Sequence, residues 1–480
     1  MNMKQVLLSL LFALLMLSCG GDEATSAQGV APGGGTPLAE APKILSTSPA
    51  NGADGLPIGD IDISLVFNQE VRPAASGVSL IQVTGGTAKS IKRASATTIL
   101  VTVNCTQFDT TVSIAFAQGL VTGLSGRQSE AYTLTFTTQK KPEIAPGIPE
   151  TPQTASTESA KQLYSYLLQQ YGKKTISSVM ADVNWNHSCA DKVYQLTGKY
   201  PAMNCYDFIH ICFSGPGSWI DYSNLQPVKE WADAGGLVQL MWHFNVPKSE
   251  GATDYNFYSA DAPFRPTRAL TAGTWEHQWF YDQMDRVADI LLQLQQAGIA
   301  ATWRPFHEAA GNATARQQAD WTRAWFWWGI EGAAAYKRLW VAMFDYFQQK
   351  GIHNLIWVWT TQNYNGNSSQ YRQDTEWYPG DAYVDIVARD LYGYNAAQNL
   401  QEFSEIQARY PHKMVALGEC GQGDGNDPST PTDFWKAGAL WSHFMVWYQQ
   451  RTDHTDTMCS DDWWRAAMSS PYVITRDQLP

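Results

Sequence analysis

The 480-residue chain is poor in positive charge, and its N-terminal apolar run is too short to span a membrane. Its 33 basic side chains are outnumbered by 45 acidic ones, which gives a formal net charge of −12. A surface of that sign repels phosphate groups, so we expect no nucleic-acid partner. With 44% apolar and 16% charged side chains the chain is globular rather than disordered, and its length predicts at least two folding units.

Tryptophan is absent from the first 184 residues, whereas all 20 tryptophans lie at or after Trp185. Indole is costly to expose and stacks well on flat apolar faces. The second part of the chain is therefore expected to contain a large aromatic core, an aromatic-lined groove, or both.

The N-terminus has the features of an export signal. Lys4 precedes an apolar run at residues 6–17, which is shorter than the ~20 residues that a membrane-spanning helix needs. The small residues around Cys19 resemble a bacterial lipobox, in which the cysteine is lipidated after residues 1–18 are removed. An acidic stretch follows at residues 21–23 and resembles the surface-export signal of Bacteroidota lipoproteins. We expect a cell-envelope protein that is anchored to the outer membrane through Cys19 and exposed at the cell surface.

Two segments of different character follow the signal. Residues 19–42 are rich in Ala, Gly, Ser, Thr and Pro and predict a flexible tether. Residues 43–138 contain short alternating apolar runs separated by turn signals, which predicts a β-sandwich that resembles bacterial immunoglobulin-like domains. Because this segment has no Trp, a spacer role is favoured over sugar binding. Residues 139–157 carry four prolines and predict a semi-rigid linker.

The segment 158–480 alternates apolar runs with stretches of helical periodicity. Eight such runs, expected as strands, occupy residues 175–181, 202–208, 237–244, 301–306, 355–360, 384–390, 414–418 and 440–447. Continuous apolar runs are typical of parallel strands that are buried on both faces. This pattern predicts an α/β fold, a (β/α)8 barrel. An open doubly wound sheet is the alternative, but neither of the glycine-rich phosphate loops expected of it occurs.

Two glutamates close predicted strands of this barrel. Glu308 ends the fourth strand region and Glu419 ends the seventh. Catalytic residues of such barrels lie where strands end, and two facing carboxylates suffice for glycoside hydrolysis. One carboxyl must carry a proton while the other is ionised. Their separation decides between retention and inversion of configuration, and the sequence does not give it.

These residues also have other interpretations. Either glutamate could be a salt-bridge partner, for instance of Arg304. The pair His307-Glu308 is not part of a zinc-protease motif because position 311 is Gly, and no G-x-S-x-G esterase motif occurs. No metal or organic cofactor is expected.

Three motifs resemble glycoside hydrolase family 26, whose members are retaining barrel enzymes and mostly endo-β-1,4-mannanases. They are Trp-Arg-Pro-Phe-His-Glu at 303–308, Trp-Phe-Trp-Trp-Gly at 325–329 and Ala-Leu-Gly-Glu-Cys-Gly at 416–421. The resemblance implies that Glu308 is the acid/base and Glu419 the nucleophile. It also places the histidine of strand three at His243 and the tyrosine of strand six at Tyr392.

A physical role can be given for each side chain around the two glutamates. His243 and His307 would orient carboxylates or bind sugar hydroxyls, and Arg304 and the Tyr392 phenol would keep a carboxylate ionised and in place. By residue type alone, His243 and Tyr392 could equally be ordinary rim or packing residues.

The aromatic floor of the cleft is less well defined by the sequence. The segment 309–324 is longer than relatives commonly have, so Trp321, Trp325, Trp327 and Trp328 all remain candidates, and Trp447 is a second possible platform.

The resemblance implies a retaining endo-β-1,4-mannanase acting on mannan, glucomannan or galactomannan. Hydrolysis of another β-glycan, such as mixed-linkage β-glucan or β-1,3-xylan, is the nearest alternative, and a non-catalytic surface glycan-binding protein is another. The expected partners are the polysaccharide, the outer membrane through the lipid anchor, and other surface proteins of glycan uptake.

Overall fold

The computed structural model describes residues 40–141, 143–181, 185–311, 324–362, 374–448 and 457–480. The predicted signal peptide and Cys19, nearly all of the tether, and Trp321 lie outside these residues. Within the described ranges, no helix is both long enough and apolar enough to cross a membrane.

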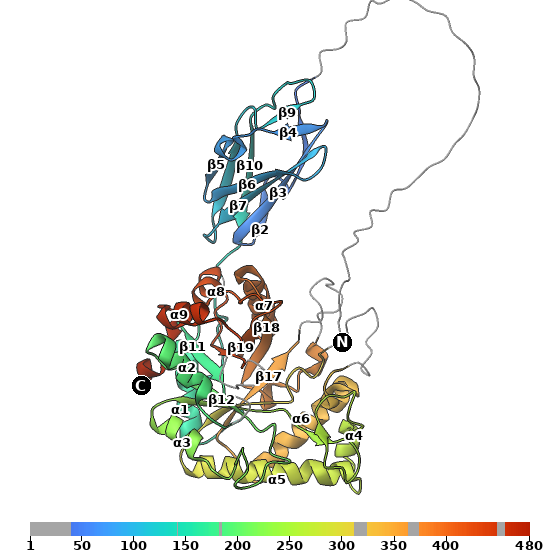
Figure 1. Ribbon diagram of the computed structural model, residues 1–480, viewed down its shortest axis with the longest axis vertical. Helices are drawn as coiled ribbons and strands as arrows, with labels where there is room; N and C mark the ends of the chain where they lie inside the picture. The colour runs from blue at the N-terminus through green and yellow to red at the C-terminus, as the bar shows by residue number, and fades with distance from the viewer. Residues whose placement is uncertain (1–39, 142, 182–184, 312–323, 363–373, 449–456) are drawn as a thin grey trace, which may run out of the picture.

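The first folded unit is a β-sandwich (Figure 1). One sheet has the order β1 (Ile44–Ser48), β3 (Gly59–Phe67), β7 (Thr98–Cys105) and β6 (Thr87–Arg93). The other has the order β2 (Ala53–Leu56), β10 (Tyr132–Thr138), β8 (Thr111–Phe116) and β5 (Ile81–Thr84), while β4 (Val71–Pro73) pairs with β9 (Val121–Gly123). The short helix η1 (Gly77–Leu80) precedes β5. Alternate residues of β3 and β7 are buried, as the sequence pattern predicts.

The second unit is a closed barrel of parallel strands. The strands are β11 (Thr175–Met180), β12 (Met203–Asp207), β13 (Leu237–Trp242), β16 (Ala301–Pro305), β17 (Leu355–Thr361), β18 (Ile386–Tyr392), β19 (Met414–Gly421) and β20 (His443–Val446). Strand β11 pairs with both β12 and β20, which closes the ring. All eight strands fall within or overlap the predicted runs, so the (β/α)8 prediction is confirmed and the open sheet is excluded.

The helices surround this barrel. They are α1 (Glu158–Gln170), α2 (Ser188–Thr197), α3 (Gln226–Asp233), α4 (Pro266–Ala269), α5 (Trp275–Gln296), α6 (Gly332–Gln349), α7 (Ala396–Arg409), α8 (Pro431–Ala437) and α9 (Asp461–Ser469). Smaller elements are the hairpin β14 (Val246–Pro247) and β15 (Tyr255–Asn256), the strand β21 (Val473–Ile474), and the short helices η3 (Trp327–Gly329), η4 (Thr375–Trp377), η5 (Asp381–Tyr383) and η6 (Arg476–Gln478).

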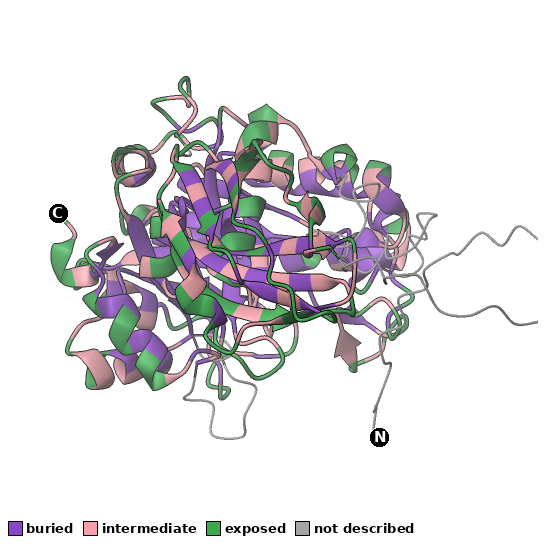
Figure 2. Ribbon diagram, turned by 90° about the horizontal axis from the view of Figure 1, so that it is seen from above, coloured by how far each residue is buried: buried purple, intermediate pink, exposed green. Residues whose placement is uncertain are grey.

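The interior explains the high tryptophan content. Figure 2 shows buried residues along the central strands and exposed residues on the surrounding helices and loops. Eleven tryptophans are essentially inaccessible to solvent: Trp231, Trp242, Trp303, Trp327, Trp328, Trp340, Trp357, Trp359, Trp377, Trp441 and Trp464. Most of the indole in the second unit therefore forms core.

The proline-rich segment is bound to the barrel at its C-terminal end rather than standing free. The Thr154 hydroxyl donates to Asp385 and to the Leu355 carbonyl, and the Ser156 N–H donates to the His353 carbonyl at 2.9 Å. A small apolar cluster also joins the two units, where Ile58 and Phe108 of the sandwich pack with Ala396, Leu400 and Ala437 of the barrel helices.

Candidate active site

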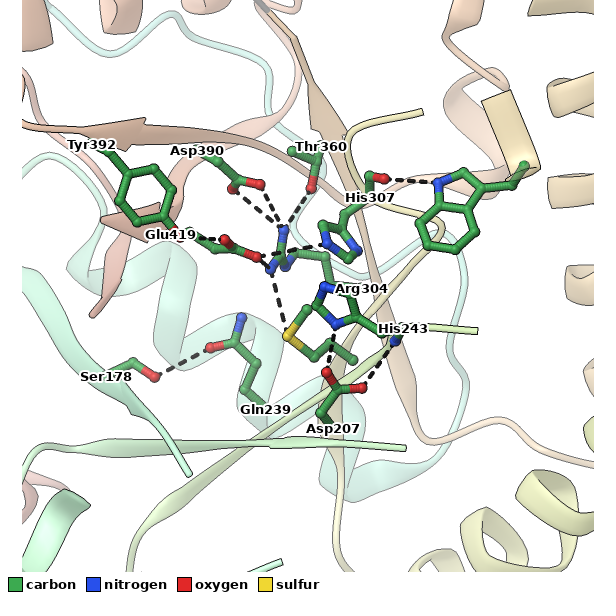
Figure 3. A network of polar contacts seen from close by, with 12 residues as sticks. Ser178, Asp207, Gln239, His243, Arg304, His307, Thr360, Asp390, Tyr392 and Glu419 are labelled. Carbon is green, nitrogen blue, oxygen red and sulfur yellow. Dashed lines mark hydrogen bonds and ion pairs between the residues drawn. The ribbon is translucent and has the colours of Figure 1, made fainter. Parts of the chain in front are cut away.

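The carboxyl ends of the barrel strands bring polar side chains into one network (Figure 3). Glu419 lies near the end of β19, with Tyr392 and Asp390 at the end of the neighbouring β18. Arg304 comes from β16, and His307 follows that strand directly. His243 follows β13 and Asp207 ends β12. Five of the predicted site residues, Glu419, Tyr392, Arg304, His307 and His243, therefore lie together in this network.

The Glu419 carboxylate is held at both oxygens. Arg304 Nη2 donates to its Oε1, and the Tyr392 hydroxyl donates to its Oε2 at 2.6 Å. His307 Nε2 lies 3.9 Å from Oε1. The residue is only 5% exposed, so these partners replace most of its hydration. Such bonds fix the carboxylate in one orientation.

The strand geometry around Glu419 depends on a glycine. Pairing of β18 with β19 shifts by one residue, so that Asp390 lies opposite Glu419 and Gly418 is passed over. A Cβ atom at Gly418 would lie 2.6 Å from Asp390 Oδ1 and 3.1 Å from the Ala388 Cβ. Only glycine allows this close approach of the two acidic residues.

Arg304 is the central cation of the site. It is fully buried, and its Nη1 donates to the Thr360 hydroxyl at 3.1 Å and to Asp390 Oδ2 at 3.1 Å. Its Nη2 reaches Met241 Sδ at 3.5 Å as well as Glu419. The guanidinium thus balances two buried carboxylates that come from neighbouring strands. Burial raises the pKa of Asp390 to about 7, although the charge of Arg304 acts in the opposite direction.

Replacing Arg304 by methionine should destabilise the protein strongly. The two carboxylates would remain buried without their cation, and removing one partner of a buried ion pair costs about 3–5 kcal/mol. The free energy of unfolding, measured by urea denaturation, should fall by that amount. The matched control is Arg338→Met on the exposed face of α6, for which a change below about 0.5 kcal/mol is expected. A loss below 1 kcal/mol for Arg304→Met would contradict this account of the network.

Glu308 sits in a strained turn directly after β16. Both Phe306 and Glu308 have positive φ, at 46° and 51°. Side chains from η3 and α6 hold this turn, because Trp328 Nε1 donates to the His307 carbonyl at 2.8 Å and the Tyr336 hydroxyl donates to the Phe306 carbonyl at 3.2 Å. Left-handed backbone at non-glycine residues persists where the surroundings impose it, and it is frequent at functional sites.

The electrostatic surroundings of Glu308 favour its protonated form. Burial of the carboxyl raises the pKa of Glu308 well above its ordinary value, and the negative charges of Asp390 and Glu419 raise it further. The residue nevertheless keeps partial exposure. The site therefore combines a carboxyl that retains its proton with a carboxylate, Glu419, that accepts two hydrogen bonds. This is the division of roles that glycoside hydrolysis requires.

The two histidines lie beside this pair and contact each other edge to face. The Asp207 carboxylate accepts from the His243 backbone N–H at 2.9 Å and lies 2.6 Å from its Nδ1, which leaves Nε2 without a hydrogen-bond partner among the described residues. The His243 and His307 rings are 4.3 Å apart at their centroids and nearly perpendicular. Burial lowers the pKa of His307 well below its ordinary value, so this imidazole is neutral at neutral pH.

The tryptophans that are candidates for the cleft floor differ clearly in solvent exposure. Trp327 and Trp328 are buried, and their indole N–H groups donate to the Phe244 and His307 carbonyls, so they support the site from beneath. Trp325 is 38% exposed. Trp447 is 8% exposed, and its ring lies 5.6 Å from that of His243. Trp325 and Trp447 are thus the two candidates that keep exposed surface among the described ones.

The structure adds residues that the sequence analysis did not single out. Asp207 and Asp390 close strands two and six in the same way that the two glutamates close strands four and seven, so their positions carried a usable signal. Phe326 packs against His307 with ring centroids 5.3 Å apart, and Trp219, in the loop after β12, is 71% exposed. Nothing in the sequence distinguishes these two from core aromatics. In the part of the chain that the structure describes, no group of three or more His, Cys, Asp or Glu side chains could hold a metal ion.

Comparison with known proteins gives two family matches. Residues 151–478 match the sequence profile of glycosyl hydrolase family 26, and residues 39–138 match that of a bacterial Ig-like domain. A mannan endo-1,4-β-mannosidase of Thermothelomyces thermophilus is 30% identical over 335 residues, which cover 67% of this chain and 61% of that protein. The chain thus spans about three fifths of that relative, and 49% of a mannan endo-1,4-β-mannosidase A of Piromyces.

Solved structures show the same similarity. The family-26 domain of an endo-β-mannanase/endo-β-glucanase from Prevotella bryantii is 51% identical, with 69% of this chain and 99% of that chain covered and a TM-score of 0.65. A β-mannanase from a symbiotic protist of the termite Reticulitermes speratus, solved with a gluco-manno-oligosaccharide, is 31% identical, with coverages of 70% and 98% and a TM-score of 0.54.

Proposed function

Because the chain belongs to glycosyl hydrolase family 26, we propose that its barrel is a retaining endo-β-1,4-mannanase that cleaves mannan, glucomannan or galactomannan. One observation carries the proposal: Glu419, held at both oxygens by Arg304 and Tyr392, lies in the same charged site as Glu308, whose pKa is raised. Curated and structural relatives named as β-mannanases support mannan as the substrate.

In the first step, Glu308 donates its proton to the glycosidic oxygen while Glu419 attacks the anomeric carbon. The bond to the leaving sugar breaks, and a glycosyl ester forms on Glu419. In the second step, the Glu308 carboxylate accepts a proton from water, whose oxygen displaces Glu419. Arg304 and Tyr392 stabilise the departing carboxylate, and His243 Nε2 is free to bind a sugar hydroxyl. The step sequence needs no metal or organic cofactor.

The proposal is tested by incubating the full chain with mannan, mixed-linkage β-glucan and β-1,3-xylan and following product size. We expect mannan to be cleaved internally, with oligosaccharides appearing before mannose. Proton NMR of the first products should show the β-anomer. Faster cleavage of glucan would favour the alternative that the Prevotella enzyme's name suggests. Binding without cleavage of any polymer would instead indicate a glycan-binding protein.

Trp219 should add affinity for long substrates. It lies in the loop after β12, whose last residue Asp207 holds His243, and its ring packs on that of His210 at 5.1 Å. An exposed indole at this rim offers a stacking face for a distant sugar unit. For Trp219→Ala we expect kcat/KM to fall about threefold to tenfold on long manno-oligosaccharides and little on short ones. Leu124→Ala, an equally exposed apolar residue of the sandwich, is the control and should change neither.

The location is also part of the proposal. We propose that Cys19 anchors the protein to the outer membrane at the cell surface, with the Ig-like domain as spacer, beside other proteins of glycan uptake. A labelled fatty acid supplied to expressing cells should be incorporated into the wild-type chain and not into Cys19→Ala. Incorporation into both would contradict lipidation at Cys19.

A further inference from the structure

An aromatic cavity lies on the barrel face opposite the catalytic residues. Its volume is about 390 Å³, and it is lined by Tyr194, Gly198, Lys199, Tyr200, Ala234, Arg476 and Asp477. These residues belong to the last turn of α2, which carries Tyr194, to the segments that lead from α2 into β12 and from α3 into β13, and to η6. In a (β/α)8 barrel the segments that enter strands lie at the N-terminal end, whereas catalytic residues lie at the C-terminal end. The cavity is therefore separate from the active site.

One wall of the cavity is a column of stacked flat groups. The Tyr194 and Tyr200 rings are 4.4 Å apart and inclined by only 13°. The Arg476 guanidinium lies over the Tyr200 ring at 3.8 Å and over the Trp231 ring at 4.6 Å. Tyr194 ends the column and is 46% exposed, so a flat aromatic surface is presented to solvent and is supported from behind.

The polar groups of the cavity are held in place, but some of their hydrogen-bond donors and acceptors have no partner among the described residues. The Arg476 backbone N–H donates to the Tyr200 carbonyl at 3.0 Å, whereas its guanidinium makes no hydrogen bond or ion pair with any described residue. Asp477 accepts one hydrogen bond, from the Thr475 hydroxyl at 2.5 Å. Lys199 Nζ donates to the Met468 carbonyl at 3.1 Å, and the Tyr200 hydroxyl donates to Asp191 at 2.9 Å. A guanidinium and a carboxylate with free capacity thus border the aromatic surface.

This combination fits a neutral sugar ring. The C–H face of a sugar packs on an aromatic ring, while its hydroxyls accept from a guanidinium and donate to a carboxylate. A purely apolar ligand would leave the Arg476 donors unpaired. We propose that this cavity is a secondary site that binds sugar units of the same β-mannan chain, outside the catalytic cleft. The proposal rests on the proposed function, which supplies the polysaccharide.

A secondary site would act through effective concentration. A polymer held at the rear of the barrel returns to the cleft faster than one that dissociates completely. Its effect should therefore appear on long or insoluble mannan and be absent on oligosaccharides too short to occupy both sites.

The test compares Tyr194→Ala with Tyr194→Phe in the full chain. Retention on insoluble mannan is measured in a Glu419→Ala background, which prevents hydrolysis, and turnover of soluble mannotetraose is measured with Glu419 intact. For Tyr194→Ala we expect the dissociation constant for mannan to rise about threefold to tenfold, with kcat/KM on mannotetraose unchanged. Tyr194→Phe keeps the ring and should behave as wild type. Arg476→Gln removes the charge and the guanidinium donors and should weaken retention similarly.

Three results would overturn the inference. Unchanged retention for both Tyr194→Ala and Arg476→Gln, in a chain whose wild type degrades mannan, would remove the secondary site and leave the proposed function intact. Equal losses on mannan and on mannotetraose would show that the substitutions act through the barrel instead. A wild-type chain that neither cleaves nor binds mannan would overturn the proposed function and this inference together.

Discussion

Replacing Glu419 by alanine should lower kcat on mannan by roughly 10⁴-fold or more, because the variant lacks the carboxylate that attacks the anomeric carbon. Arg304 would keep Asp390 and Thr360 as partners, so the barrel should remain folded. Turnover is measured as release of reducing ends from mannan, and folding by the urea denaturation midpoint.

The matched control for Glu419 is Glu376→Ala, an exposed carboxylate of η4, which should keep wild-type turnover. Azide provides a second check with an aryl β-mannobioside. The anion is expected to enter the space left by the carboxylate, form the C–N bond at the anomeric carbon and release the phenol, giving an α-glycosyl azide. Near wild-type turnover, or a β-configured azide, would rule out Glu419 as the nucleophile.

Glu308→Gln should lower kcat on mannan by about 10²–10⁴-fold, because glutamine cannot donate a proton to the leaving oxygen or accept one from water. How much the loss of proton donation slows the first step depends on the leaving group. With an aryl β-mannobioside whose phenol leaves without protonation, the glycosyl-enzyme should form quickly and then persist. Intact-protein mass spectrometry should detect this adduct, and analysis of proteolytic peptides should locate it on Glu419.

The pH profile provides an independent check on Glu308. The raised pKa lets Glu308 keep its proton to higher pH than an ordinary glutamate, so kcat/KM should fall as the pH rises through that pKa. The alkaline limb should therefore be lost in Glu308→Gln while the wild type retains it. A variant that keeps the wild-type alkaline limb would assign this titration to another group, and Asp390, with a pKa of about 7, would be examined next.

Much of the barrel could be predicted because parallel strands that are buried on both faces appear in the sequence as continuous apolar runs. Runs such as residues 355–360 are apolar on both faces, and all seven residues of β17 are indeed buried. The helical spacing of six side chains also predicts an inward face for α6, and all of them except the half-buried Phe344 are buried: Tyr336, Leu339, Trp340, Met343, Phe344 and Phe347. The polar residues at the ends of these apolar runs then indicated which side chains lie at the carboxyl ends of the strands, where the candidate active site is found.

The partners within the site could not be predicted, since they depend on distances between strands. Nothing in the sequence pairs Arg304 with both Asp390 and Glu419, because the shifted pairing at Gly418 brings these acids together. The role of each tryptophan was also inaccessible, since periodicity does not distinguish the buried Trp328 from the partly exposed Trp325. For the same reason, docking of residues 154–156 on the barrel was not foreseen in a segment that composition describes as a linker.

The bonds of Arg304 limit how this enzyme can diversify. They join β16 to β17, β18 and β19, so the groups that perform the chemistry also connect strands of the barrel to one another. Drift at Arg304 would therefore be penalised twice, through lost turnover and through lost stability. Adaptation to new branching patterns or backbone sugars should therefore accumulate in the loops that carry Trp219 and Trp325, where a side chain can change without disturbing the charge balance beneath it.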